Sequence, residues 1–84
     1  MDQAEMMLRT WTHWTTIGIF EIHEMMIAKT INYELKINGD HLGYYCNYWT
    51  AAEDLAAGSH DGNIGASASA IGVPASIDGW NMLR

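Results

Sequence analysis

The sequence predicts a small α+β domain in which an antiparallel β-hairpin, or a larger sheet containing it, is packed by short α-helices. Three stretches carry this prediction: an alternating segment that turns at Asn-Gly, a short alanine-rich segment between capping residues, and a glycine-rich C-terminal third. We expect the C-terminal third to be irregular. With 84 residues the chain forms one domain, 1–84, near the lower limit of what folds without a disulfide or metal.

The first residues favour a helix over roughly 3–14. Asp2 and Glu5 have the spacing of a capping-box variant. Apolar side chains then recur at i, i+4 and i+7, at Met7, Trp11 and Trp14. Several threonines in the same stretch oppose a helix, because branched side chains lose rotamer freedom there.

Residues 15–28 are compatible with both a helix and a strand. As a helix they have an apolar stripe, and as a strand their isoleucines alternate between two faces. Gly18 and the density of isoleucine favour a strand near 16–22. We expect this strand to continue into helical or irregular residues.

Residues 31–46 predict a hairpin, because apolar and polar side chains alternate up to Asn38-Gly39, the pair typical of a type I′ turn. A two-residue turn aligns four pairs, Ile37 with Asp40, Leu35 with Leu42, Tyr33 with Tyr44, and Ile31 with Cys46. The expected core residues are therefore Ile31, Tyr33, Leu35, Leu42, Tyr44 and Cys46. The outer face of the hairpin then carries Glu34, Tyr45 and Trp49.

A helix is expected at 51–57, with Thr50 as its N-cap, Glu53 as the third residue of a capping box, and Gly58 ending it. Beyond it we expect a turn at Asp61-Gly62, a short helical turn near 67–71, and a final turn capped by Ser76. The apolar residues expected to fill the core from this segment are Ile64, Ile71, Val73, Ile77 and Trp80.

Charge limits the partners that the protein can have. Ten acidic residues against four Lys and Arg give a formal net charge of −6, which opposes direct binding to nucleic acid and suits either a basic protein partner or plain solubility. No apolar run approaches the ~20 residues of a membrane helix, and the acidic start differs from a leader. The single Cys46 forms no internal disulfide, so we expect a cytosolic protein.

No catalytic or metal-binding motif is complete, and the sequence predicts neither an enzyme nor a cofactor. His23-Glu24 begins a zinc-binding H-E-x-x-H pattern, but the fifth position is Ile27. The four histidines and Cys46 lack paired metal-ligand spacing. In the expected register Cys46 is a buried, unreactive thiol.

The hairpin INYELKINGDHLGYYCNYW, the helix TAAEDLAAG and the closing GVPASIDGW resemble, in type, the small acidic orphan proteins of bacteriophages and mobile elements. Anti-CRISPR proteins belong to this class. The resemblance spans residues 27–80. It implies a compact α+β inhibitor that docks on host defence machinery, in some cases through an acidic surface placed where the host protein binds nucleic acid.

We therefore expect a non-catalytic inhibitor, phage-encoded, that binds a basic nucleic-acid-handling host protein such as a CRISPR–Cas effector. The residues expected to contact this partner are Glu34, Tyr45, Trp49, Glu53, Asp54 and Asp61. Two alternatives stay open. One is a structural protein that forms a homodimer through the hairpin face or edge. The other is a small metal protein or enzyme that uses the histidines and Cys46.

Overall fold

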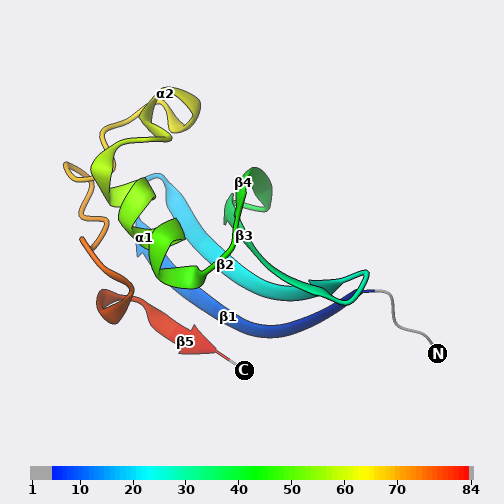
Figure 1. Ribbon diagram of the computed structural model, residues 1–84. Helices are drawn as coiled ribbons and strands as arrows, with labels where there is room; N and C mark the ends of the chain where they lie inside the picture. The colour runs from blue at the N-terminus through cyan, green and yellow to red at the C-terminus, as the bar shows by residue number, and fades with distance from the viewer. Residues whose placement is uncertain (1–4, 84) are drawn as a thin grey trace.

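A computed structural model describes residues 5–83, which form a five-stranded antiparallel sheet with its helices on one face (Figure 1). The elements in chain order are β1 (Glu5–Thr15), β2 (Gly18–Ile27), β3 (Thr30–Ile37), β4 (Asp40–Tyr45), α1 (Tyr48–Ala57), α2 (Asp61–Ile64), the 3-10 helix η1 (Ile77–Gly79) and β5 (Asn81–Leu83). The predicted α+β class, with an antiparallel sheet and short helices, is confirmed.

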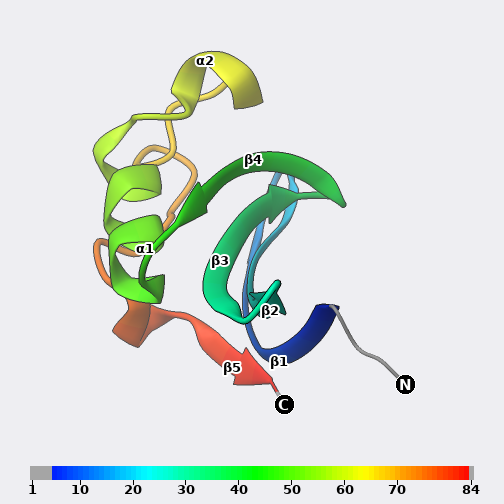
Figure 2. The ribbon, with the colours of Figure 1, turned by 45° about the vertical axis from the view of Figure 1, so that its right-hand side comes forward.

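The sheet has the strand order β4-β3-β2-β1-β5, so the first four strands form a meander and the last returns beside the first. Figure 2 shows α1 and the segment that follows it on one side of the sheet. We call this side the inner face. Its core is built from sheet, helix and C-terminal residues: Trp11, Phe20, Ile22, Tyr33, Leu35, Ala51, Ala52, Leu55, Ala68, Val73 and Trp80.

The helix predicted for residues 3–14 is wrong, because β1 occupies the described part of this stretch, from Glu5 onward. Trp11 is buried on the inner face whereas Trp14 is 70% exposed, which is the alternation of a strand and not the shared face of a helix. Branched threonines between the aromatic residues favour this extended conformation. Asp2 of the expected capping box lies outside the described residues.

The strand predicted at 16–22 is confirmed in type and is longer than expected. β2 extends to Ile27, so residues 23–27 are neither helical nor irregular. The side chains of Phe20, Ile22 and Glu24 alternate inward, as the period of two requires. Pairing with a strand on each side sustains β2 beyond the isoleucine-rich part.

The Asn38-Gly39 turn is confirmed, and both residues have positive φ, 50° and 86°. The Asn38 side chain also accepts a hydrogen bond from Ile19 N and donates one to Ile17 O, each at 3.0 Å. These two bonds fix the β3–β4 turn against the turn that joins β1 and β2.

The predicted hairpin register is correct only beside the turn. Ile37 faces Asp40, but a bulge follows, and Leu35 faces Gly43 where Leu42 was expected. The remaining pairs shift accordingly, with Glu34 opposite Tyr44 and Tyr33 opposite Tyr45. The extra residue in β4 exchanges the two faces of the strand beyond the bulge.

This exchange overturns several burial predictions. Tyr33 and Leu35 are buried as expected, and Leu42 is partly buried against the core. Tyr44 and Cys46 are exposed and lie outside the core, contrary to prediction. Ile31, also predicted to be core, is exposed for another reason, because it lies beside the turn between β2 and β3. Tyr45 lies on the inner face instead of the outer one, and Trp49 belongs to α1 instead of a strand.

α1 begins three residues before the predicted start. Asn47 is the N-cap, and its side-chain oxygen accepts a hydrogen bond from Thr50 N at 2.9 Å, so Thr50 is inside the helix. The predicted end is confirmed, because Gly58 adopts the left-handed conformation with φ of 99°. One face of the helix buries Ala51, Ala52 and Leu55.

The C-terminal segment packs as expected, with Val73 and Trp80 buried. Three further predicted core residues pack against the core while partly exposed, namely Ile64, Ile71 and Ile77. Ser76 precedes η1 but makes no side-chain capping bond. β5 pairs with Thr10–Thr12 of β1 and was not expected from the sequence.

Candidate protein-interaction site

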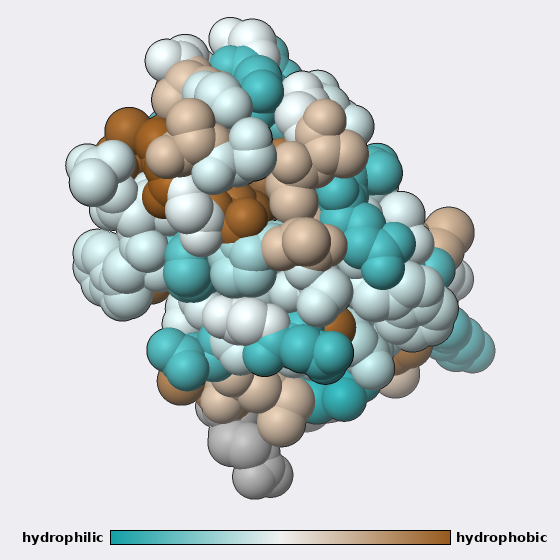
Figure 3. Space-filling model, turned by 90° about the vertical axis from the view of Figure 1, so that its left-hand side faces the viewer, coloured by the Kyte–Doolittle hydropathy of each residue, from teal (hydrophilic) through white to brown (hydrophobic). Residues whose placement is uncertain are grey.

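Residues 48–80, which contain α1, α2 and η1, cover the inner face, and we call them the helical layer. This layer contains no Lys or Arg, and its four acidic residues are Glu53, Asp54, Asp61 and Asp78. The cationic residues of the described chain are Arg9, Lys29 and Lys36, and all three precede the layer in the sheet and its turns. Figure 3 views the molecule from the side of this layer.

The exposed side of α1 combines an aromatic and an acidic residue. Trp49 and Glu53 are one helical turn apart and both are exposed, so they share the solvent-facing side of the helix. Trp49 is 48% exposed, and its ring contacts Tyr48 edge-on at 5.1 Å between centroids. An exposed tryptophan beside carboxylates is a typical anchor for a protein partner.

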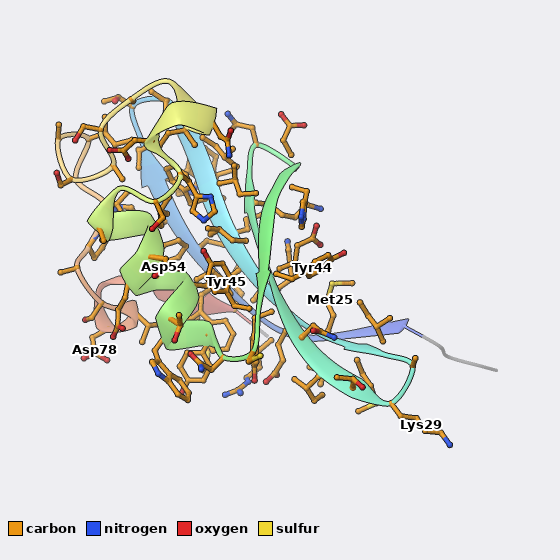
Figure 4. The ribbon with its side chains drawn as sticks, turned by 45° about the horizontal axis from the view of Figure 1, so that its top comes forward. Met25, Lys29, Tyr44, Tyr45, Asp54 and Asp78 are labelled. Atoms are coloured by element: carbon orange, nitrogen blue, oxygen red, sulfur yellow. The ribbon has the colours of Figure 1, made fainter. Side chains whose placement is uncertain are left out.

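The other acidic residues of the layer differ in how they are held. Asp78 of η1 is exposed. Asp61 is partly buried, and its Oδ1 accepts a hydrogen bond from Ala68 N at 3.0 Å, which ties α2 to the following turn. Asp54 is partly buried and lies near Tyr45 (Figure 4). Glu53 and Asp78 are therefore the carboxylates most open to a partner.

Tyr45 joins the sheet to the helical layer. Its hydroxyl oxygen lies 2.7 Å from Nε2 of His60, and the two groups share a hydrogen bond. Burial, and then the nearby Asp54 carboxylate, raise the pKa of Tyr45 to about 12. Gly43 lies beside the His60 ring, and a Cβ there would sit 3.5 Å from its Cε1, an ordinary packing distance. The predicted role of Tyr45 as an outward aromatic contact does not fit this inward position.

Glu34 is separated from the other predicted contact residues by the sheet. It lies on the outer face, where its Oε2 accepts a hydrogen bond from Nδ1 of His41 at 2.7 Å. Its cross-strand neighbour Tyr44 is 58% exposed and points away from α1 (Figure 4). The structure thus brings Trp49, Glu53, Asp54 and Asp61 into one layer and places Glu34 on the opposite side.

A polar cluster that sequence reasoning missed lies on the inner face beside α1. Glu24 is only 7% exposed, and both of its oxygens accept hydrogen bonds from Arg9, at 2.8 and 2.6 Å. The Tyr33 hydroxyl donates a third at 2.8 Å. The Arg9 guanidinium also lies over the rings of Trp11 and Tyr48, at 5.0 and 5.5 Å from their centroids.

This cluster has a structural explanation. The hydrogen bonds from Arg9 lower the pKa of Glu24, against the effect of burial, and the hydrogen bond from Tyr33 lowers it further. Two cross-strand partners thus stabilise the ionised carboxylate, so it is a satisfied buried charge. The sequence did not indicate the ion pair between Arg9 and Glu24, because the two residues are 15 positions apart.

Across residues 5–83 there is no pocket and no group of three or more His, Cys, Asp or Glu side chains placed to hold a metal ion. None of the helices described is long and apolar enough to span a membrane. Comparison with known proteins found no matching family model, no matching curated protein and no matching solved structure.

Proposed function

We propose that the protein is a non-catalytic inhibitor that binds a basic, nucleic-acid-handling host protein through the exposed side of its helical layer. Trp49 is the aromatic anchor, and Glu53 and Asp78 supply the negative charge that meets the partner. The resemblance to small acidic phage proteins extends this proposal to a phage-encoded inhibitor acting in the host cytosol. A CRISPR–Cas effector is a partner of the expected kind.

One observation carries the proposal: the helical layer contains carboxylates and no Lys or Arg. The helical layer has four carboxylates and neither Lys nor Arg, whereas Lys29 and Lys36 lie in the sheet and its turns. A surface of one sign attracts the opposite sign at long range and accelerates association. A protein that binds nucleic acid displays clustered Lys and Arg, and this cluster fits such a layer.

The exposed side of α1 adds a short-range contact to this attraction. Charge complementarity governs the approach of two proteins more than the strength of the final complex. Buried aromatic side chains contribute much of that strength, and tryptophan is enriched among them. Trp49 lies one turn before Glu53 on the same exposed side, so one docked helix would use both contacts.

The proposal is tested by capturing partners from bacterial lysate with the wild-type protein and with the double variant Glu53→Lys/Asp78→Lys. Each reversal adds two positive charges, so the formal net charge rises from −6 to −2. We expect capture of a basic partner to fall about ten-fold or more at low salt. Both residues are exposed, so the fold should be unaffected.

The matched control is Asp40→Lys, a reversal at an exposed residue of the β3–β4 hairpin, outside the helical layer. It should retain most of the capture. Trp49→Ala should weaken capture at every salt concentration, because it removes an apolar contact that salt does not screen. Equal capture by the wild type and the Glu53→Lys/Asp78→Lys variant at all salt concentrations would rule out the proposed layer.

A further inference from the structure

The outer sheet face, opposite the helical layer, carries charges of both signs framed by exposed apolar side chains. Every helix described packs on the inner face. Trp14 and Tyr44 project from the outer face and are 70% and 58% exposed, and Leu83 of β5 is also exposed. Isolated exposed apolar residues are ordinary, but two large aromatic rings on one sheet face indicate a contact surface.

The strand register places acidic and basic side chains in matched rows at the centre of this face. In one row Glu21 of β2 is the direct neighbour of Lys36 of β3. In the next row His23 of β2 is the direct neighbour of Glu34 of β3. Each row therefore has an acidic group on one strand and a basic or imidazole group on the other.

We propose that this face binds a second copy of the same chain through a two-fold axis that runs parallel to β2 and β3, between them. Such an axis places each β2 residue opposite the β3 residue of the same row in the second copy. Lys36 then faces Glu21 of the second copy, and Glu34 faces His23 of the second copy. Because the interface is two-fold symmetric, each of these two contacts occurs twice in the dimer.

Charge selects a second copy as the occupant of this face. The exposed carboxylates of the helical layer, Glu53 and Asp78, would repel those of an identical layer, which disfavours contact between two copies through that side. The outer face has Lys36 and two histidines beside Glu21 and Glu34, and its rows are complementary to themselves. Trp14 and Tyr44 lie on β1 and β4, to either side of the charged rows, and supply the apolar contact.

Dimerisation through the outer face goes beyond the proposed function and does not depend on it. In such a dimer both helical layers point outward, in opposite directions. The dimer could then engage two basic partners, or two sites on one partner, with the gain in avidity that bivalency brings. The capture experiment changes residues of the helical layer, whereas the dimer experiment changes residues of the outer face. A negative result in one of them therefore does not contradict the proposal tested by the other.

The test uses analytical ultracentrifugation of the full chain over a wide concentration range, with the variants Glu21→Lys and Lys36→Glu. We expect the wild type to dimerise and each single variant to lose about 100-fold in dimer affinity, because each creates two like-charge contacts. An equimolar mixture of the two variants should recover the dimer, since both contacts become complementary again. The double variant Glu21→Lys/Lys36→Glu should also recover it.

Recovery of the dimer would show that each single variant loses a specific contact and keeps its fold. Circular dichroism of each variant checks the fold directly. Glu53→Lys serves as the matched control, because it reverses a charge on the helical layer and should leave the dimer unchanged. Trp14→Ala should weaken the dimer without changing the charges. A wild type that stays monomeric at every concentration, or a mixture that recovers no dimer, would overturn the inference.

Discussion

At the scale of single residues, Glu24 is an acidic group whose negative charge is neutralised by a neighbouring strand of the same sheet. Arg9 binds both of its oxygens and Tyr33 donates to one of them, so its charge is absent from the exposed surface. Arg9 is in turn committed to this contact and to two aromatic rings. The ion pair therefore removes the Glu24 charge from the surface and leaves Arg9, although partly exposed, without free charge to offer a partner.

We predict that Glu24→Gln lowers the free energy of unfolding by about 2–3 kcal/mol. The amide keeps the shape but loses the ionic hydrogen bonds, and the buried Tyr33 hydroxyl keeps only a weaker acceptor. The loss stays below that of a fully buried pair, because the Arg9 side chain is 41% exposed and water can solvate it. Urea unfolding measures the change. As a control, Glu53→Gln on the exposed side of α1 should change the free energy of unfolding by less than about 0.5 kcal/mol.

The same variant should change how stability depends on pH. The pKa of Glu24 is lowered in the folded protein, so its contribution is complete above the ordinary glutamate pKa and disappears as pH falls through the folded value. As the pH falls, the free energy of unfolding of the wild type should therefore decrease faster than that of Glu24→Gln. The difference in free energy of unfolding between the two proteins should become smaller. A difference that stays constant from neutral to acidic pH would contradict a role for the ionised carboxylate.

At the scale of elements, residues 31–46 show what the sequence can and cannot predict. The Asn38-Gly39 turn followed from local chemistry, because the two positive φ angles are a property of those residues alone. The bulge near Leu42 did not follow, since no local pattern marks it, and beyond it Tyr45 points inward and bonds to His60, 15 residues away in the sequence. One inserted residue was sufficient to exchange the positions of Tyr44 and Tyr45.

β1 was mispredicted for a related reason. A helix and a strand both accommodate Trp11 and Trp14, and only pairing with β2 and β5 selects the strand. Tertiary pairing overrides weak local preference in such cases. The capped end of α1 at Gly58, in contrast, was predicted correctly because a helix terminus is determined by a few adjacent residues.

The candidate site was predictable where it depended on charge and not where it depended on register. Glu53, Asp54 and Asp61 were predicted as acidic contacts in a stretch without Lys or Arg, and all three lie in the helical layer. Glu34 and Tyr45 were assigned to one contact surface from an assumed pairing, and the bulge separated them. Asp78 was overlooked, although it is exposed, like Glu53, and lies in the same stretch without Lys or Arg.

The turn between β2 and β3 gives a prediction at the scale of elements. Ala28 and Lys29 have positive φ of 51° and 69°, the conformation that Asn-Gly adopts readily in the other hairpin. Replacing the pair, as Ala28→Asn/Lys29→Gly, should raise the free energy of unfolding by about 1 kcal/mol, because strain is relieved at both positions. Urea unfolding measures the gain.

Lys29→Ala is the matched control for this turn, because it removes the charge and leaves the strain. Its free energy of unfolding should stay within about 0.5 kcal/mol of wild type. Lys29 lies at the far end of the hairpin from α1, so neither variant should disturb the helical layer (Figure 4). A stabilised Lys29→Ala would show that charge, and not backbone conformation, limits the stability of this hairpin.

At the scale of the whole molecule, the sheet separates two surfaces of different chemistry. The helical layer on one side has four acidic residues and no Lys or Arg, whereas the outer face has matched charges of both signs and two exposed aromatic rings. The first suits a basic partner of another kind, and the second suits an identical copy. A chain of 84 residues can thus present two distinct contacts because one sheet divides them.

The return of the chain to its first strand gives a prediction at the same scale. β5 pairs with β1 through Thr10–Thr12, closing the sheet edge with the last described residues of the chain. Ending the chain after Trp80 should lower the free energy of unfolding by about 1–2 kcal/mol, since three cross-strand pairs are lost. It should also promote aggregation, because a longer stretch of β1 becomes an uncovered edge.

Light scattering and urea unfolding of the shortened chain test both effects, with Met82→Ser/Leu83→Ser as the control. The control keeps the backbone pairing and removes the two exposed apolar side chains of β5. If backbone pairing protects the edge, the control should stay monodisperse in a dilute solution in which the shortened chain aggregates. Equal behaviour of the two variants would mean that the apolar side chains, and not the strand itself, determine how the molecule associates.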